Sequence, residues 1–302
     1  MTEKNILITG GLGYIGSVLV NGSPNNWKIT ILDNCSMGNN NIQLGKKVNF
    51  ISGDIRNYDL IEELIKKSDV IVHLAGIVGE ASFQKNPSIA TEINQNATKK
   101  IVHFTKKYKK KLIFMSTCSI YGFNSKLCTE ETVPNPVDDY SRSKIESEFD
   151  IKQELDNFVI FRLGTVYGWS PRMRFDIIIN KIIEKKLWGE PIEIFGGEQW
   201  RPFIHVEDAA NALILAVEKS VRNEVFNLVA ENHKLLEVAE NITNNLKIIS
   251  EKTDNRSYYA DNQKIKKLLG WQPKMNIEKT IEKFSKVDYN DKKFHNHEWD
   301  YS

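Results

Sequence analysis

The side chains best suited to chemistry are Tyr140 and Lys144, four residues apart in Tyr140-Ser141-Arg142-Ser143-Lys144. On a helix this spacing places them on one face. A phenol has an ordinary pKa near 10, and lowering it by about three units requires roughly 4 kcal/mol of preferential phenolate stabilisation. A neighbouring ammonium can supply this stabilisation. The pair therefore predicts a proton-transfer site, although two exposed helix residues have the same spacing.

The segment before this pair favours the catalytic interpretation. The apolar run KLIFMST predicts a buried strand whose end carries Ser116 and Thr117, followed by Ser119. Open parallel sheets bind ligands beyond the carboxyl ends of their strands. Hydroxyl groups at that edge, followed by Tyr140, predict an active site.

A glycine-rich turn follows the first predicted strand. NILIT runs directly into GGLGYIGSVLV, which places Gly10, Gly13 and Gly16 at a strand-to-helix turn. Glycines there allow a tight turn and a close approach of backbone N–H groups to a diphosphate. Asp33 ends the second strand, 17 residues after Gly16, where a dinucleotide fold binds the ribose hydroxyls. Its carboxylate repels a 2′-phosphate and Asn34 adds no cation, so NAD is favoured over NADP.

Short apolar runs alternate with amphipathic segments through the first half of the chain. This alternation predicts an α/β fold in which a Rossmann-type, doubly wound parallel sheet carries helices on both faces. Gly22 and Pro24 predict an early end of the first helix. The predicted strands are NILITG, WKITILD, VNFISGD, DVIVHLAG, KLIFMS and NFVIFRL.

The alternation of apolar runs and amphipathic segments becomes irregular after Arg162, where glycine and proline interrupt short elements. We therefore predict a smaller C-terminal substrate-binding domain that interleaves with the first. The predicted NAD-binding domain is 1–165, with 203–230 returning to it. Residues 166–202 and 231–287 form the predicted nucleotide-sugar-binding domain, and 288–302 a polar tail with little order.

Composition, charge runs and cysteine spacing limit the class of protein. The 302 residues carry a formal net charge of +2, with 41% hydrophobic and 26% charged residues, which is ordinary for a soluble protein. The basic run 106–111 is interpreted as the solvated end of a helix, so we expect no nucleic-acid partner. His295 and His297 have metal-like spacing but lie in the polar tail. No leader or membrane-length apolar segment is present, which predicts no membrane association. Cys35, Cys118 and Cys128 lack disulfide or metal-site spacing, so we expect a cytoplasmic protein without a metal.

A series of motifs in order along the chain resembles the extended short-chain dehydrogenase/reductase family, in its NAD-dependent nucleotide-sugar epimerase/dehydratase group. The resemblance spans nearly the whole chain and implies NAD as cofactor, a nucleotide-diphosphate sugar as substrate and a homodimer through helices around 91–107 and 140–155. The motifs are TGGLGYIGS, LDN, SGDIR, HLAG, STCSIYG, DYSRSK, RLGTVYG, WRPFIHVEDAA and LLGWQP.

The resemblance also implies roles for individual residues. Tyr140 acts as base and acid, Lys144 lowers its pKa and binds the nicotinamide ribose, and Thr117 hydrogen-bonds the reacting oxygen. The implied cofactor-binding residues are Gly10, Gly13, Tyr14, Ile15, Gly16, Asp33, Asn34, Asp54, Ile55, Leu74, Ala75, Tyr140 and Lys144, with Asp54 and Ile55 at the adenine. The implied substrate-binding residues are Asn94, Thr117, Arg201 and Arg256, whose two guanidinium groups suit a diphosphate. Leu74 and Ala75 are core residues in either interpretation, and Asn94 has the alternative of a helix-surface residue.

The residues after Thr117 narrow the reaction. Dehydratases and decarboxylases of the family carry a carboxylate there, whereas this chain has Cys118 and Ser119, which argues against both reactions. We therefore predict a nucleotide-sugar 4-epimerase. The alternatives are a 4-dehydrogenase or ketoreductase of a heptose or deoxysugar pathway and, third, a non-catalytic NAD-binding protein.

For three side chains the sequence leaves two alternative roles open. Cys118 is either a buried structural thiol, the interpretation we favour, or a proton donor for C3/C5 epimerisation. Arg172 and Arg174 either contact the sugar or its phosphates, or form salt bridges between domains. They belong to RLGTVYGWSPRMRFD, which resembles a subgroup acting in polysaccharide and heptose pathways. The nucleotide base and the sugar are not specified by the sequence.

Overall fold

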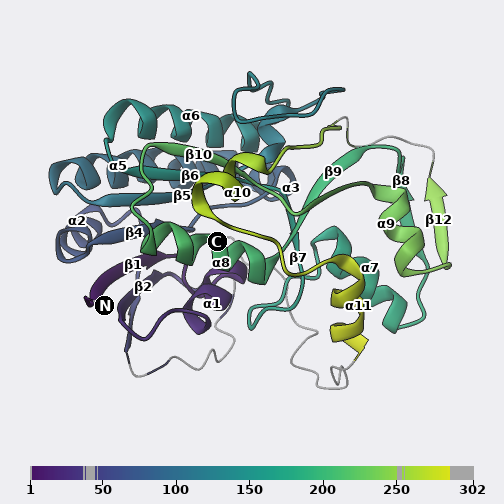
Figure 1. Ribbon diagram of the computed structural model, residues 1–302, viewed down its shortest axis with the longest axis horizontal. Helices are drawn as coiled ribbons and strands as arrows, with labels where there is room; N and C mark the ends of the chain where they lie inside the picture. The colour runs from purple at the N-terminus through teal and green to yellow at the C-terminus, as the bar shows by residue number, and fades with distance from the viewer. Residues whose placement is uncertain are drawn as a thin grey trace.

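The computed structural model describes residues 2–36, 38, 45, 47–249, 254 and 256–285 (Figure 1). The predicted polar tail 288–302, with His295 and His297, lies outside the described residues.

A seven-stranded parallel sheet forms the centre of the protein. Its order β10-β6-β5-β4-β1-β2-β3 places β1 in the middle, with the chain winding outward in both directions. The predicted Rossmann-type α/β fold is confirmed, and all six predicted strands are present. The seventh, β10, was not among the predicted apolar runs. The strands are β1 (Lys4–Thr9), β2 (Trp27–Asp33), β3 (Val48–Ser52), β4 (Val70–His73), β5 (Lys111–Thr117), β6 (Phe158–Leu163) and β10 (Glu224–Leu228).

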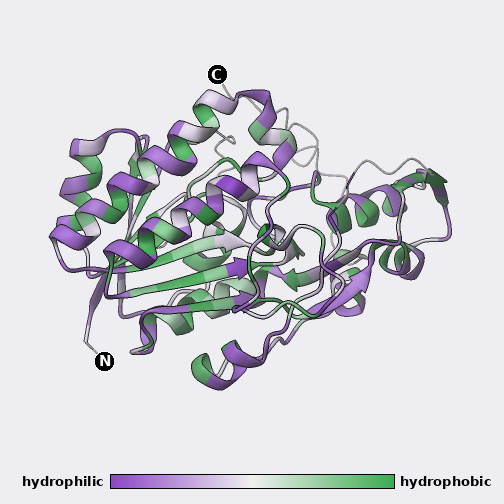
Figure 2. Ribbon diagram, turned by 90° about the horizontal axis from the view of Figure 1, so that it is seen from above, coloured by the Kyte–Doolittle hydropathy of each residue, from purple (hydrophilic) through white to green (hydrophobic). Residues whose placement is uncertain are grey.

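Helices cover both faces of this sheet and enclose two separate apolar cores. On one face, α1 (Tyr14–Asn21) packs against α8 (Val206–Glu218). On the other, α2 (Tyr58–Lys67), α5 (Thr98–Lys107) and α6 (Asp139–Glu154) turn their apolar sides to the strands and their polar sides outward (Figure 2). Helix α1 ends early, as predicted, with Gly22 at its C-cap.

Two small sheets lie beyond the carboxyl edge of the central sheet. Strands β7 (Thr165–Tyr167), β9 (Trp200–His205) and β11 (Glu231–Lys234) form one, and β8 (Ile192–Phe195) and β12 (Leu246–Ile249) form the other. A third apolar core joins them to three helices. The domain boundaries given above stay a prediction. The helices are α7 (Ile178–Leu187), α9 (Leu235–Ile242) and α11 (Ile277–Ser285).

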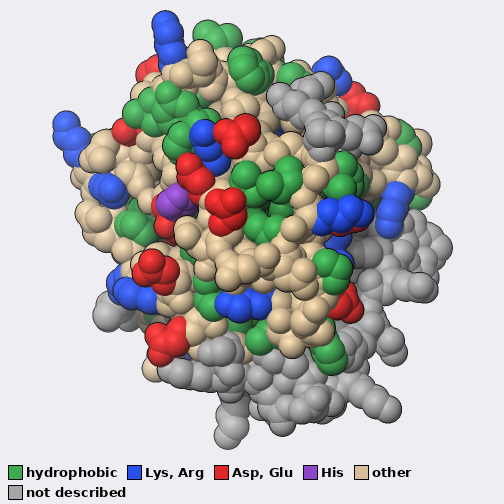
Figure 3. All heavy atoms as spheres, turned by 90° about the vertical axis from the view of Figure 1, so that its right-hand side faces the viewer, with side chains coloured by type: hydrophobic (Ala, Val, Ile, Leu, Met, Phe, Trp, Pro, Cys, Tyr) green, Lys and Arg blue, Asp and Glu red, His purple; other side chains and the backbone are tan. Residues whose placement is uncertain are grey.

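The short helices lie near the ends of the central strands. They are α3 (Glu80–Lys85), α4 (Pro87–Thr91), a π-helical turn (Glu92–Ala97) and a 3-10 turn (Cys118–Tyr121), while α10 (Gln263–Leu269) lies beside β10. Basic and acidic side chains are interspersed on the end of the molecule that carries β8 and β12 (Figure 3). Within the described ranges, no helix has the length and apolar content that a bilayer span needs.

The basic run 106–111 is only partly solvated. Lys106 and Lys107 form exposed ion pairs with Glu154 and Glu62. Lys111 is only 8% exposed, and its ammonium donates to the backbone carbonyl oxygens of residues 216 (2.6 Å) and 219 (3.0 Å). The prediction of a solvated run is therefore wrong for Lys111, because its ammonium satisfies carbonyl groups at the C-terminal end of α8.

Candidate active site

The glycines at 10, 13 and 16 in the turn between β1 and α1 have little or no room for a Cβ atom. Gly10 has φ +71°, and a Cβ there would lie 2.7 Å from the backbone nitrogen of Ala75. A Cβ on Gly13 would lie 3.1 Å from the carbonyl oxygen of Gly10, and one on Gly16 would collide with the same oxygen. The turn thus brings the backbone of Gly10 against Leu74 and Ala75, as a cradle for a diphosphate requires.

The residues predicted to bind adenosine lie beside this turn. Both carboxylate oxygens of Asp33 accept backbone hydrogen bonds, from Leu12 N (3.0 Å) and Cys35 N (2.9 Å). Asn34 Nδ2 donates to Asp54 Oδ2 (3.2 Å). Burial raises the pKa of Asp33, while the charge of Arg172 lowers it. The cradle and this fixed carboxylate fit a dinucleotide. The remaining predicted residue of this part, Ile55, is 5% exposed.

Tyr14 and Ile15, also predicted to contact the cofactor, use their side chains to pack α1 against the segment after β7. The Tyr14 hydroxyl donates to Gly168 O and accepts from Asn180 Nδ2 (3.0 Å). Ser170 Oγ donates to Tyr14 O (2.7 Å). Ile15 packs against two of the apolar cores. The phosphate turn is therefore joined directly to residues 168–180.

Tyr140 and Lys144 are each 6% exposed, so the alternative of two exposed helix residues is wrong. Tyr140 lies in the first turn of α6, and its backbone N–H donates to Glu80 Oε2 (3.0 Å). Burial raises the pKa of the Tyr140 phenol to about 12, while the charge of Arg174 and a side-chain hydrogen bond with Thr117 act in the opposite direction. Base catalysis by Tyr140 therefore needs stabilisation of its phenolate.

Lys144 is held against the central sheet, and no carboxylate of the described residues pairs with it. Its ammonium donates to the carbonyl oxygen of Met115 (3.0 Å) and lies 4.8 Å from the centre of the Phe114 ring. Burial lowers the pKa of Lys144 to about 8. This cation retains hydrogen-bonding capacity, since one of its three N–H donors reaches Met115.

A row of hydroxyl groups leads from the end of β5 to the start of α6. Thr117 Oγ1 lies 2.9 Å from Ser119 Oγ, which lies 2.9 Å from Ser141 Oγ. Ser141 donates through its Oγ (2.6 Å) and its backbone N–H (2.7 Å) to Asp138 Oδ1. Asp138 is the N-cap of the helix that carries Tyr140. The row therefore fixes Thr117 relative to that helix.

The two arginines predicted to meet a diphosphate lie next to each other. Arg201 Nη2 and Arg256 Nη2 both donate to Asp254 Oδ2, each at 2.8 Å. Arg256 Nη1 also donates to Asp138 Oδ2 (3.1 Å). The carboxylates of Asp254 and Asp138 thus bring both guanidinium groups to the N-terminal end of α6.

Asn94 and Cys118 are buried and bonded to the backbone. Asn94 is 2% exposed, which excludes the helix-surface alternative. Its amide donates to Ile77 O and accepts from Ile77 N, each at 2.8 Å, within the π-helical turn. The Cys118 thiol is fully buried, and it donates to Arg162 O (3.1 Å). Asn94 therefore holds the loop after β4, and Cys118 is a buried structural thiol.

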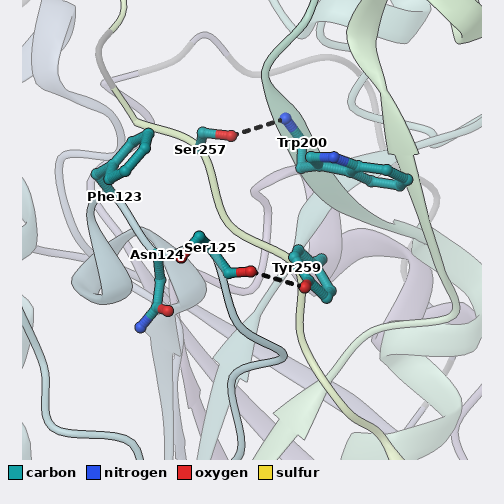
Figure 4. A pocket seen from close by; sticks show the side chains of 6 residues that line it. All are labelled: Phe123, Asn124, Ser125, Trp200, Ser257 and Tyr259. Carbon is teal, nitrogen blue, oxygen red and sulfur yellow. Dashed lines mark hydrogen bonds between the residues drawn. The ribbon is translucent and has the colours of Figure 1, made fainter.

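A surface cavity of about 400 Å³ lies beside this site (Figure 4). Trp200 lines it, and because Arg201 is the next residue of β9, the two side chains leave opposite faces of the strand. Ser257 Oγ accepts from Trp200 N (3.1 Å), and Tyr259 donates to Ser125 O (2.9 Å). None of the proposed catalytic groups lines this cavity. Its lining residues are Phe123, Asn124, Ser125, Trp200, Ser257 and Tyr259.

Four residues at the site were absent from the sequence-based predictions: Glu80, Asp138, Ser141 and Asp254. Asp138 had a local signal, since an aspartate just before a predicted helix is a common N-cap. The contacts of Glu80 with Tyr140 and of Asp254 with Arg201 had no such signal, because each joins residues far apart in sequence.

Residues 6–228 match the model of the NAD dependent epimerase/dehydratase family. The chain is 32% identical, over 92% of its length and 96% of the relative's, to a putative UDP-glucose 4-epimerase of Methanocaldococcus jannaschii. It is 31% identical to a UDP-N-acetyl-alpha-D-glucosaminuronate decarboxylase of Bacillus cytotoxicus, over 80% of this chain and 79% of that protein. A UDP-glucuronic acid 4-epimerase from Bacillus cereus, solved with UDP-glucuronic acid and NAD, superposes with a TM-score of 0.82 at 28% identity, covering 92% of this chain and 96% of that one.

Proposed function

Because the chain belongs to the NAD dependent epimerase/dehydratase family, we propose that it is a nucleotide-sugar 4-epimerase. The observation that carries the proposal is the burial of Tyr140 and Lys144 on one helix, next to the Thr117 hydroxyl, with no carboxylate directly after Thr117. NAD is the cofactor of the family, and when bound it accepts a hydride from the sugar and gives it back.

The residues of this chain have the following parts in the proposed reaction. Tyr140 removes the proton from the C4 hydroxyl during oxidation and returns it to the C4 oxygen during reduction. Lys144 stabilises the phenolate and binds the nicotinamide ribose. Thr117 hydrogen-bonds the reacting oxygen. Arg201 and Arg256 bind the substrate diphosphate, for which the planar forks of guanidinium groups are well suited.

The positions after Thr117 favour epimerisation over the other reactions of the family. Dehydration and decarboxylation need a further acid or base next to the sugar. Cys118 is directed into a buried cluster, and Ser119 is engaged with Thr117 and Ser141. Among the described residues, Glu80 accepts hydrogen bonds from the backbone N–H of Tyr140 and from the Gln84 side chain. Since the relatives include a decarboxylase, this distinction rests on the residues of this chain alone.

Proton NMR in D2O tests the proposal directly. The purified protein is incubated with UDP-glucose, UDP-N-acetylglucosamine or UDP-glucuronic acid, the kinds of nucleotide sugar named for its relatives. A 4-epimerase forms the C4 epimer without net NADH and without deuterium at C5. Tyr140→Phe is expected to lower turnover by roughly 10²- to 10⁴-fold. A 6-deoxy-4-keto product or release of CO2 contradicts the proposal.

The second candidate is a 4-dehydrogenase or ketoreductase that exchanges its hydride with an outside partner. It rests on the same residues and predicts one NADH for each ketone formed. A non-catalytic NAD-binding protein is the third, and the intact Thr117, Tyr140 and Lys144 argue against it. The proposal also includes cytoplasmic polysaccharide biosynthesis, and a homodimer through α5 and α6.

A further inference from the structure

Arg172 is a buried cation that has no direct counter-ion among the residues the structure describes. Its side chain is 4% exposed, and its Nε has no hydrogen-bond partner. Nη1 donates to Met173 O (3.3 Å), and within the described part of the chain no carboxylate pairs with this guanidinium. A guanidinium does not lose its proton in proteins. Burial without a counter-ion therefore opposes folding.

The segment around Arg172 is bonded to the first turn of α1. The backbone N–H of Arg172 donates to Ser170 Oγ (3.2 Å). Ser170 Oγ also bonds Ser17 Oγ (2.9 Å) and donates to the carbonyl oxygen of Tyr14 (2.7 Å). These contacts hold Arg172 beside the phosphate turn.

The carboxylates near Arg172 are already bonded to other groups and do not neutralise its charge directly. The charge of Arg174 lowers the pKa of Arg172, while the charges of Asp176 and Asp33 raise it. Asp176 is already paired with Arg174, at 2.6 Å. Asp33 has both oxygens engaged by backbone N–H groups. None of these groups supplies the direct acceptor that the Arg172 Nε lacks.

We propose that Arg172 binds the diphosphate of NAD, with its Nε–H donating to a phosphate oxygen above the glycine turn. Backbone N–H groups at a helix N-terminus favour such an anion, and a guanidinium fork matches its geometry. The proposal concerns cofactor binding alone and does not depend on which sugar reaction the protein catalyses. It also assigns Arg172 a contact with the cofactor in place of the sugar contact or interdomain salt bridge considered above.

Isothermal titration calorimetry of Arg172→Met is the first test. Affinities for NAD and for ADP-ribose, which retains the diphosphate, are expected to fall about 10- to 100-fold, the range for a lost charge-assisted hydrogen bond. Arg172→Lys keeps the charge but lacks the fork, and should recover part of the loss. Arg222→Gln, an equal loss of charge at an exposed position, should change neither affinity.

Other ligands separate the possible sources of the anion. Binding of UDP should be unchanged in Arg172→Met, and a loss of UDP affinity with intact ADP-ribose binding assigns Arg172 to the sugar nucleotide and overturns the proposal. A loss confined to NADP assigns it to a 2′-phosphate and also overturns the proposal.

Stability without the cofactor gives an independent readout with the opposite sign. Because removal of an unpaired buried charge relieves its cost, Arg172→Met should raise the thermal midpoint of the NAD-free protein while reducing the upward shift that NAD produces. A residue with only a structural role would lower the midpoint and leave NAD affinity unchanged, and that result overturns the proposal.

Discussion

Two groups of buried charged side chains differ in the partners that the protein provides for them. In the first, Glu148 (0% exposed) and Arg162 (2% exposed) form an ion pair beneath the active site. Ser116 donates to Glu148 Oε1 (2.7 Å), and Arg162 Nη1 donates to the Tyr121 hydroxyl (3.0 Å) and to the carbonyl oxygen of residue 130 (2.9 Å). Each charge is satisfied by protein groups.

In the second group, Lys144 and Arg172 are nearly as buried, and among the described residues their side chains donate to backbone carbonyl groups. Burial lowers the pKa of both side chains. From this difference we infer that the paired buried charges belong to the framework, whereas Lys144 and Arg172, the two buried cations at the candidate site, lower stability and are retained for a ligand. Four measurements test this comparison.

The largest effect is expected from Glu148→Leu. This change leaves Arg162 buried without its partner, so the free energy of unfolding should fall by roughly 3–5 kcal/mol. Urea denaturation measures the loss. The double variant Glu148→Leu/Arg162→Met should recover much of it, since no unpaired charge remains. A loss of less than about 1 kcal/mol in the single variant would show that the pair is not part of the framework.

Lys144→Met should act in the opposite direction on stability. Removing this buried ammonium is expected to raise the free energy of unfolding of the NAD-free protein at pH 7, by up to roughly 3 kcal/mol for a pKa held near 8. Turnover should fall, because in the proposed reaction Lys144 stabilises the phenolate of Tyr140. Denaturation and activity assays on the same preparation measure the expected gain in stability and the expected loss of turnover. A destabilised variant would show that Lys144 stabilises the fold, as Glu148 and Arg162 are expected to do.

The pH dependence of stability sharpens the same point. The pKa of Lys144 is near 8 in the folded protein and about 10.5 in the unfolded chain. Between these pH values the unfolded chain binds more protons at this lysine than the folded protein does. The contribution of Lys144 to the free energy of unfolding therefore becomes more favourable as pH rises. The stability difference between wild type and Lys144→Met should therefore shrink from pH 8 to pH 10. A difference that is constant over this range argues against a buried ammonium.

The smallest effect is expected at the exposed pair Lys106–Glu154. Water and salt screen these charges, so Lys106→Ala should leave the denaturation midpoint unchanged. The comparison with Glu148→Leu then shows that burial, and not pairing alone, determines the size of the effect. A destabilisation similar to that of Glu148→Leu would remove the distinction.

The fold was largely predictable because its signals are local. Each predicted strand is a short apolar run, and the glycines at 10, 13 and 16 indicate the turn by their spacing. The pairing of Arg201 and Arg256 through Asp254 was not predictable, since it depends on a contact across 53 residues of sequence. The burial of Lys111 was missed for the same reason, because its acceptors lie in and just after α8.

The contacts between α1 and residues 168–180 also oppose any separation of the phosphate turn from that segment. Tyr14 bonds Gly168 and Asn180, while Ser170 bonds Tyr14 and Ser17. A hinge that separated these segments would break four buried hydrogen bonds, each contributing about 1 kcal/mol. The phosphate turn and residues 168–180 are therefore expected to move together rather than separately.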